Sequence, residues 1–388
     1  MIQLLLALIY LSFISLGLPD GLLGAAWPVM CVEMNVPVSY AGLISTTIAA
    51  GTIISSLLSD RVTSRFGTGR VTAVSVAMTA FALLGFSLTK NFWFLFLWAI
   101  PYGLGAGSVD ASLNNYVALH YASRHMSWLH CMWGLGACAG PYIMGYALTA
   151  NQNWNSGYRY VAFLQMALTA VLFLSLKIWV TRESECAEEK TAQNAPASLK
   201  EIVAIAGVRE VMVAFFCYCA LEGTAMLWGS TYLVRQIGLD EERAASLASL
   251  FFIGITAGRF LSGFLTMKFH DTAMIRIGQA IIAVGIAVML LPFGELTATA
   301  GLLLIGLGCA PVYPCIIHST PEHFGQQYSQ AVIGVQMASA YTGTLLMPPV
   351  FGLLANHISV ALLPWYMGVI LVLMIVMCEA LNKKTAKK

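Results

Sequence analysis

The feature that most constrains this chain is the recurrence of uncharged apolar runs that are long enough to cross a lipid bilayer. A hydrocarbon core about 30 Å thick requires about 20 apolar residues in a helix. Runs of this length without any charged residue occupy 38–59, 71–89, 296–317 and 358–378. These runs predict membrane-spanning helices, and they predict them more firmly than they define the ends of each helix.

The overall composition leads to the same class of fold. Of the 388 residues, 59% are hydrophobic and only 10% are charged, whereas soluble domains carry about 25% charged residues. A water-soluble chain of this composition would be unable to cover its surface with polar groups. Including runs that one charge interrupts, we expect twelve spans, at 3–30, 38–59, 69–89, 91–118, 125–149, 158–181, 208–235, 243–267, 273–293, 296–318, 327–355 and 358–381.

One long polar segment divides these spans into two sets of six. It begins at Arg182 and continues to about Glu201, and it is charged and poor in large apolar residues, as is typical of an aqueous linker. The predicted organisation is a six-helix bundle over 1–181, a cytoplasmic linker over 182–206 and a second six-helix bundle over 207–388.

The distribution of Lys and Arg predicts the orientation. With a cytoplasmic N-terminus, the outer loops keep only four basic residues, Lys90, Arg159, Arg235 and Arg243. Cytoplasmic loops of membrane proteins carry the excess of basic residues. We therefore expect a multi-pass protein of the plasma membrane, of the bacterial cytoplasmic type, with both termini in the cytoplasm. The N-terminus has no basic region or cleavage site, so we interpret it as a retained first helix.

Short matches at a nearly constant offset link the two halves, which indicates duplication. They are Gly103-Leu104-Gly105 with Gly306-Leu307-Gly308 at 203 residues, Asp20-Gly21 with Glu222-Gly223 at 202, and Pro141…Gly145 with Pro348…Gly352 at 207. Parallel repeats of this kind are typical of transporters that bind their substrate between the halves, near the bilayer midplane.

Several segments carry a resemblance to a known family. They are Ser59-Asp60-Arg61 through Arg65-Phe66-Gly67, Gly17-Leu18-Pro19-Asp20-Gly21, Val109-Asp110-Ala111-Ser112-Leu113-Asn114, Leu129-His130…Gly140-Pro141 and Gly258-Arg259-Phe260. The chain resembles the major facilitator superfamily over essentially its whole length, and within it the fucose permease-like sugar–proton symporters and sodium-glucose-transporter-like relatives. The resemblance implies an all-α fold of two pseudo-symmetric six-helix bundles that transports by alternating access.

Three acids lie well inside apolar spans: Asp20, Asp110 and Glu222. A charged side chain there costs about 2.5–3.5 kcal/mol even on the lenient insertion scale. Each acid is therefore a candidate for binding and releasing a coupling proton; the alternative is a permanently protonated acid that bridges helices. The resemblance implies that Asp20 and Asp110 are the substrate- and proton-linked pair, although the family often has Glu at the second position.

The candidate substrate-binding residues are polar or aromatic side chains within spans. Asp110 and Asn114 are four residues apart, so one helix face presents a carboxylate and an amide that can bind ligand hydroxyls. Aromatic rings can stack on a sugar, and core packing is the competing explanation for each of them. The predicted set is Asn114, His130, Trp133, Gln165, Trp27, Trp228 and Gln336, and Tyr116 and Tyr313 are further aromatic residues within spans.

The remaining charges near the cytoplasmic ends of spans are candidates for gating. Asp60, Arg61 and Arg65 follow the second span, and Arg259 lies in the eighth. We predict a conformational latch, and the alternative for the basic residues is snorkelling toward the interface.

These observations predict a proton-coupled symporter of a monosaccharide or similar polyol, which acts as a monomer. A drug or metabolite exporter of the same superfamily remains open, and so does sodium as the coupling ion. An enzyme is not expected, because no catalytic constellation is recognisable. No cofactor, metal or nucleic-acid partner is expected either, since the nine cysteines form no CxxC pair and no basic patch alternates with aromatic residues.

Overall fold

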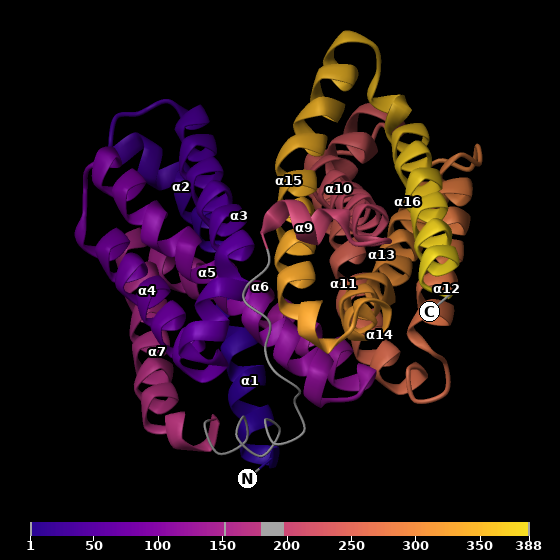
Figure 1. The fold of residues 1–388 in the computed structure, drawn as a ribbon. Coiled ribbons are helices and arrows are strands. Elements are labelled where there is room, and N and C mark those ends of the chain that lie inside the picture. Colours follow the sequence, from indigo (N-terminus) through magenta and orange to yellow (C-terminus); the bar gives the residue numbers. More distant parts are fainter. Residues whose placement is uncertain (1, 151–152, 180–197, 387–388) are drawn as a thin grey trace. The chain divides into compact units, whose positions relative to one another are not determined.

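The computed structural model describes residues 2–150, 153–179 and 198–386, and its regular structure in these ranges is helical (Figure 1). The first half of the chain contains α1 (Ile2–Gly17), α2 (Leu22–Glu33), η1 (Val38–Tyr40), α3 (Ala41–Phe66), α4 (Thr68–Leu88), α5 (Phe92–His120), α6 (Ser123–Thr149) and α7 (Trp154–Leu174). The second half contains α9 (Leu199–Ala204), α10 (Val208–Tyr232), η2 (Leu233–Ile237), α11 (Glu241–Leu265), α12 (Asp271–Met289), α13 (Glu295–His318), α14 (Thr320–Phe324), α15 (Gln326–His357), η3 (Val360–Leu362) and α16 (Leu363–Thr385).

The membrane spans agree with the prediction. Within the described ranges, eleven segments are long and apolar enough to cross a bilayer, and α1 and α2 together form one of them. The twelfth predicted span is α6, which has 27 residues. It is not one of these eleven segments. The all-α membrane fold is therefore confirmed.

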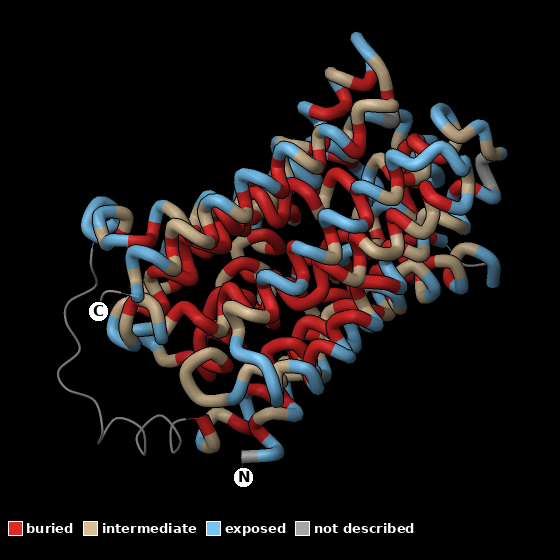
Figure 2. The backbone as a smooth tube through the Cα atoms, turned by 90° about the vertical axis from the view of Figure 1, so that its right-hand side faces the viewer, coloured by how far each residue is buried: buried red, intermediate tan, exposed pale blue. Residues whose placement is uncertain are grey.

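Large apolar side chains remain exposed on the helices, while many polar side chains are buried. Leu174 is 84% exposed and Val369 is 72% exposed, whereas Gln165 and Gln336 are 1% and 0% exposed. Figure 2 shows exposed and buried residues following one another along the same helices. Soluble proteins rarely expose such large apolar area, so a lipid environment explains these helix faces.

The structure consists of two compact units. One comprises the described residues of Met1–Tyr116 and Met132–Ala197, and the other comprises those of Val117–Cys131 and Ser198–Lys388. The predicted division at 1–181, 182–206 and 207–388 stays a prediction, because residues 182–197 of the linker lie outside the described ranges. The rest of the predicted linker contains α9, which begins with a capping box between Ser198 and Glu201.

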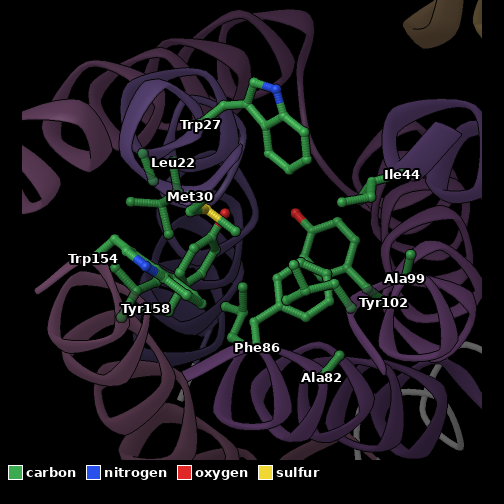
Figure 3. Close-up of a cluster of buried hydrophobic side chains, with 14 of the residues drawn as sticks. Leu22, Trp27, Met30, Ile44, Ala82, Phe86, Ala99, Tyr102, Trp154 and Tyr158 are labelled. Carbon is green, nitrogen blue, oxygen red and sulfur yellow. The ribbon is translucent and has the colours of Figure 1, made fainter. Parts of the chain in front are cut away.

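Each unit is held together by long helix pairs. In the first unit α4 packs along α7, and in the second unit α12 packs along α13 while α10 packs along α15 and α16. Figure 3 shows the core of the first unit, where Trp27 and Met30 from α2 lie with Tyr102 from α5 and Trp154 and Tyr158 from α7.

Close contacts at glycine recur at the offset of the sequence repeat. An alanine Cβ at Gly105 would lie 2.7 Å from the Ser75 carbonyl oxygen. The same atom at Gly308 would lie 2.6 Å from the carbonyl oxygen of Gly278. Both residues of the second contact lie 203 positions after those of the first. The two halves therefore build the same helix contact from the same repeat, which supports the inferred duplication.

Candidate functional site

The first span is interrupted at residues 18–21, and Asp20 lies in the interruption. Pro19 lacks a backbone N–H and disfavours the helical conformation of the residue before it. The chain turns tightly here, with the Asp20 N–H donating to Gly17 O at 3.1 Å and the Leu22 N–H donating to Pro19 O at 3.0 Å. The span predicted over 3–30 is therefore present, and it consists of two helices, α1 and α2, joined by this turn. Broken helices of this kind often form the ligand and ion sites of transporters.

A close approach of α1 and α6 places Trp133 beside this acid. A Cβ on Gly17 would overlap the Trp133 carbonyl oxygen, and a Cβ on Gly136 would overlap the Ile14 carbonyl oxygen. Only glycine permits this backbone contact between the helices. The half-buried Trp133 indole donates its Nε1–H to Asp20 Oδ2 at 2.9 Å, and the Asp20 side chain is otherwise exposed.

The second acid of the first unit lies on α5 with the predicted amide neighbour. Asn114 Nδ2 donates to Asp110 Oδ1 at 2.8 Å and to Asp110 O at 3.0 Å. Both side chains are buried. The Asp110 carboxyl group is close enough to Asp20 for the two charges to repel each other. Tyr102, which the sequence did not single out, also lies within the electrostatic influence of Asp20. One neighbourhood therefore holds two acids, an amide and a phenol.

The second unit pairs Glu222 with Arg259. Arg259 Nη2 lies 3.2 Å from Glu222 Oε1, and the two side chains are 3% and 15% exposed. Tyr218 lies beside both of them. The sequence predicted separate roles for these charges, proton coupling for the acid and gating for the base. The structure brings them together as one ion pair, and the role of each charge stays a prediction.

His130 in the second unit lies at one side of an aromatic cluster that is centred on Tyr313. The centres of the His130 and Tyr313 rings lie 4.6 Å apart, edge to face. The centres of the Phe215 and Tyr313 rings also lie 4.6 Å apart. Tyr218 completes the group at 5.7 Å from Tyr313. Phe215 and Tyr218 are not among the residues predicted from the sequence. Phe215, Tyr218 and Glu222 stand at positions i, i+3 and i+7 on α10. This spacing places the three on one helix face and could have identified the two aromatic residues from the sequence.

The two predicted glutamines bridge helices. Gln165 Nε2 donates to Ser15 O at 2.7 Å, and its Oε1 accepts from Thr79 Oγ1 at 2.9 Å. Gln336 Nε2 donates to Thr320 Oγ1 at 3.0 Å. Each amide thus already has partners within the protein, and their predicted role in substrate binding stays a prediction.

The predicted tryptophans Trp27 and Trp228 both have packing partners. Trp27 is 5% exposed and meets Phe92 edge to face at 6.5 Å in the core of the first unit. Trp228 is half-buried and donates its indole N–H to Pro348 O at 2.9 Å. These contacts match the alternative explanation for aromatic residues in spans, which was core packing.

The predicted gating charges of the first unit lie at the C-terminal end of α3. Asp60 is half-buried, while Arg61 and Arg65 are exposed. The Arg65 guanidinium lies 5.4 Å from the centre of the Phe66 ring. The gating role of these residues stays a prediction. In the part of the chain that the structure describes, no three His, Cys, Asp or Glu side chains are grouped so that they could hold a metal ion.

Comparison with known proteins assigns the family. The model of the Major Facilitator Superfamily matches residues 9–341 and 211–387. The glucose/mannose transporter GlcP of Bacillus subtilis is 22% identical over 363 residues, which cover 91% of this chain and 88% of that protein. The sodium-dependent glucose transporter 1 of Danio rerio is 23% identical over 390 residues, covering 90% of this chain and 64% of that protein.

Solved structures share the fold. The transporter FucP in its outward conformation aligns with a TM-score of 0.74 and 14% identity, over 96% of this chain and 97% of that one. The proton:xylose symporter XylE aligns with a TM-score of 0.78 and 12% identity, over 96% and 94% of the two chains. Because the family model covers most of the sequence and the fold agrees, the chain belongs to the Major Facilitator Superfamily and is a multi-pass membrane transporter, not an enzyme.

Proposed function

We propose that the protein transports a monosaccharide or a similar polyol together with a proton, by alternating access. The observation that carries this proposal is the pair of intramembrane acids in the first unit: Asp20 in the broken span, which accepts a hydrogen bond from Trp133, and the buried Asp110 on α5, which accepts one from Asn114. Two acids that repel each other favour a state in which one of them holds a proton. Transport can be coupled to that proton because a proton and a ligand drive a conformational change when they bind one state better than the other.

Asp20 suits the role of proton carrier better than its repeat counterpart Glu222. The hydrogen-bond donor to Asp20 is a neutral indole, so a proton on Asp20 simply removes an expensive intramembrane charge. A proton on Glu222 would instead leave the buried Arg259 guanidinium uncompensated. Removing one charge of a buried pair is strongly unfavourable. Glu222 and Arg259 therefore serve as a permanently charged ion pair, and Asp20 and Asp110 carry the proton.

The substrate class follows from the polar and aromatic groups within each unit and from the relatives. Asn114 and Asp110 can bind hydroxyl groups, and the Tyr313 and His130 rings offer apolar and polar edges of the kind that sugars contact. Proteins named for glucose and mannose, and for xylose, are among the similar ones. We place the protein in a bacterial-type cytoplasmic membrane with both termini inside, on the basis of the distribution of its basic residues.

The proposal is tested first by a binding screen on purified protein. D-glucose, D-mannose, L-fucose, D-xylose, cis,cis-muconate and a cationic drug are compared by thermal shift, because a ligand that binds the folded state raises the melting temperature. We expect stabilisation by one or more sugars. Stabilisation by the cationic drug alone would contradict the sugar assignment and favour the exporter.

The second test measures uptake into proteoliposomes under an imposed pH gradient, and again under a sodium gradient. Asp20→Asn and Asp110→Asn preserve the size of the side chain but cannot release a proton. We expect each to lose accumulation while keeping exchange of substrate at equilibrium. Asp240→Asn is the matched control, because Asp240 caps α11 outside the acid pair and Asn caps helices equally well. Full pH-driven accumulation by both mutants of the acid pair would refute proton coupling through these acids.

A further inference from the structure

We propose that Trp133 is a positioning residue. Its indole N–H holds the Asp20 carboxylate more strongly when Asp20 is charged, and protonation of Asp20 therefore changes the position of the indole on α6. This inference rests on the proposed role of Asp20 in proton coupling. It assigns Trp133 a function different from the substrate contact that its position in a span suggested.

The geometry supports a direct link between the two side chains. Trp133 Nε1 lies 2.9 Å from Asp20 Oδ2. The indole nitrogen can donate a hydrogen bond but cannot accept one. The indole can therefore hydrogen-bond to the carboxyl group only by donating its N–H to a carboxyl oxygen atom. This bond joins the interruption between α1 and α2 to the middle of α6.

The strength of this bond depends on the charge of the acid. Hydrogen bonds to an ionised carboxylate are roughly twice as strong as bonds between neutral groups. The indole is held firmly when Asp20 is charged and is released in part when Asp20 binds a proton. Trp133 thus stabilises the charged form of Asp20, and protonation weakens the tie between the two helices at this point.

The backbone contact around the pair allows a small change to reach the helix. Gly17 on α1 lies against the Trp133 carbonyl oxygen, and Gly136 and Gly140 on α6 lie against the Ile14 and Leu18 carbonyl oxygens. Close-packed elements transmit displacement because they cannot compress. A change in the position of the indole therefore acts on two helices that are already in contact.

Two other titratable groups share this neighbourhood, and both come from α5. Asp110 acts on Asp20 as a like charge, and Tyr102 lies within the influence of Asp20. A proton that binds Asp110 would also alter the field at Asp20. The test must therefore separate a response of the indole to Asp20 from a response to Asp110.

The first experiment requires no transported substrate. Ultraviolet resonance Raman spectra of the purified full chain report indole hydrogen bonding, and they are recorded from pH 4 to pH 9 for wild type, Asp20→Asn and Asp110→Asn. We expect a pH-dependent indole band in wild type that disappears in Asp20→Asn and persists with a shifted midpoint in Asp110→Asn. An identical titration in wild type and Asp20→Asn, or no titration in wild type, would overturn the inference.

The second experiment removes the donor but keeps an aromatic ring. In Trp133→Phe the charged form of Asp20 loses its donor, so the alkaline limb of pH-driven uptake should move up by about one pH unit. The probe is the sugar that gives the largest thermal shift. Trp128→Phe is the matched control, because Trp128 lies on the same helix and donates its indole N–H to the Phe260 carbonyl oxygen at 3.3 Å. Its pH profile should stay that of wild type.

The outcomes distinguish this inference from the proposed function. Full accumulation by Asp20→Asn would contradict proton coupling at Asp20. If Asp20→Asn loses accumulation while the profile of Trp133→Phe coincides with wild type, the coupling role stands and the role of Trp133 is refuted. If Trp133→Phe does not fold, the Raman titration of wild type and Asp20→Asn decides alone.

Discussion

Replacing Gly136 with alanine should separate the two helices on which the candidate site depends. The added Cβ would overlap the Ile14 carbonyl oxygen and would lie 3.0 Å from both the Ile14 carbonyl carbon and the Leu18 nitrogen. All three neighbours are backbone atoms, which cannot rotate away as a side chain would. To restore normal van der Waals separation, α1 and α6 would have to move apart by roughly 1 Å.

The expected magnitude follows from two opposing effects. Alanine in place of glycine stabilises a helix interior by about 0.5–1 kcal/mol. Overpacking a well-packed contact costs about 1–3 kcal/mol, and the backbone character of this contact favours the upper end. Gly145, on the same helix, has no neighbouring atom within 4 Å of its virtual Cβ. Gly145→Ala should therefore gain only the stabilisation of alanine over glycine in a helix. The free energies of unfolding of the two variants should differ by about 1–3 kcal/mol, which is the overpacking cost.

The assay is thermal unfolding of the purified variants in detergent, at several heating rates because unfolding of membrane proteins is often irreversible. The repeat supplies an internal replicate. A Cβ at Gly343 on α15 would lie 2.5 Å from the Phe216 carbonyl oxygen and 3.2 Å from its carbon. Gly343→Ala should consequently lower the melting temperature, as Gly136→Ala does. Only Gly136→Ala should also disturb the contact between Trp133 and Asp20.

Equal melting temperatures for Gly136→Ala and Gly145→Ala would refute this reasoning, because they would show that the α1–α6 contact can relax without cost. A destabilised Gly136→Ala beside an unaffected Gly343→Ala would contradict a narrower point, the equivalence of the two repeat contacts.

Two further predictions concern the ion pair and the orientation. Arg259→Gln and Glu222→Gln should each lower the melting temperature by the equivalent of about 3–5 kcal/mol, because a single change leaves one buried charge without its partner. The double variant should recover part of this loss. Single variants as stable as wild type would show that the pair is solvated. Cysteines introduced at Glu188 and Lys387, in a background without accessible thiols, should resist an impermeant thiol reagent in intact cells, and their labelling from outside would reverse the proposed topology.

Much of the site depends on which face each helix presents to its neighbours, and this could not be derived from the sequence. From their positions in apolar spans, Gln165 and Trp27 were predicted as substrate contacts, with core packing as the competing explanation for Trp27. In the structure Gln165 binds Ser15 and Thr79, which lie 150 and 86 residues away. Glu222 was predicted to couple protons because it is an acid inside a span, and Arg259 was predicted to act in gating because it lies near a cytoplasmic span end; their contact across 37 residues was not predicted. Such pairings depend on helix rotation and crossing, which small residues at distant contacts determine.

The sequence by itself determined the membrane class, the positions of the apolar spans, the repeated motifs of the two halves and the presence of intramembrane acids. Each of these depends on quantities that accumulate along the chain, such as the transfer free energy of a run of residues or the recurrence of a short motif. It also determined the Asp110–Asn114 contact, because i,i+4 spacing on a helix is local. Only the tertiary structure decided that Trp133 holds Asp20 and that Arg259 holds Glu222. Those contacts require helices that are remote in sequence to approach each other closely at glycine. A polar group without a partner is costly in lipid, so each buried polar group must find a partner, but this cost does not say which partner it is.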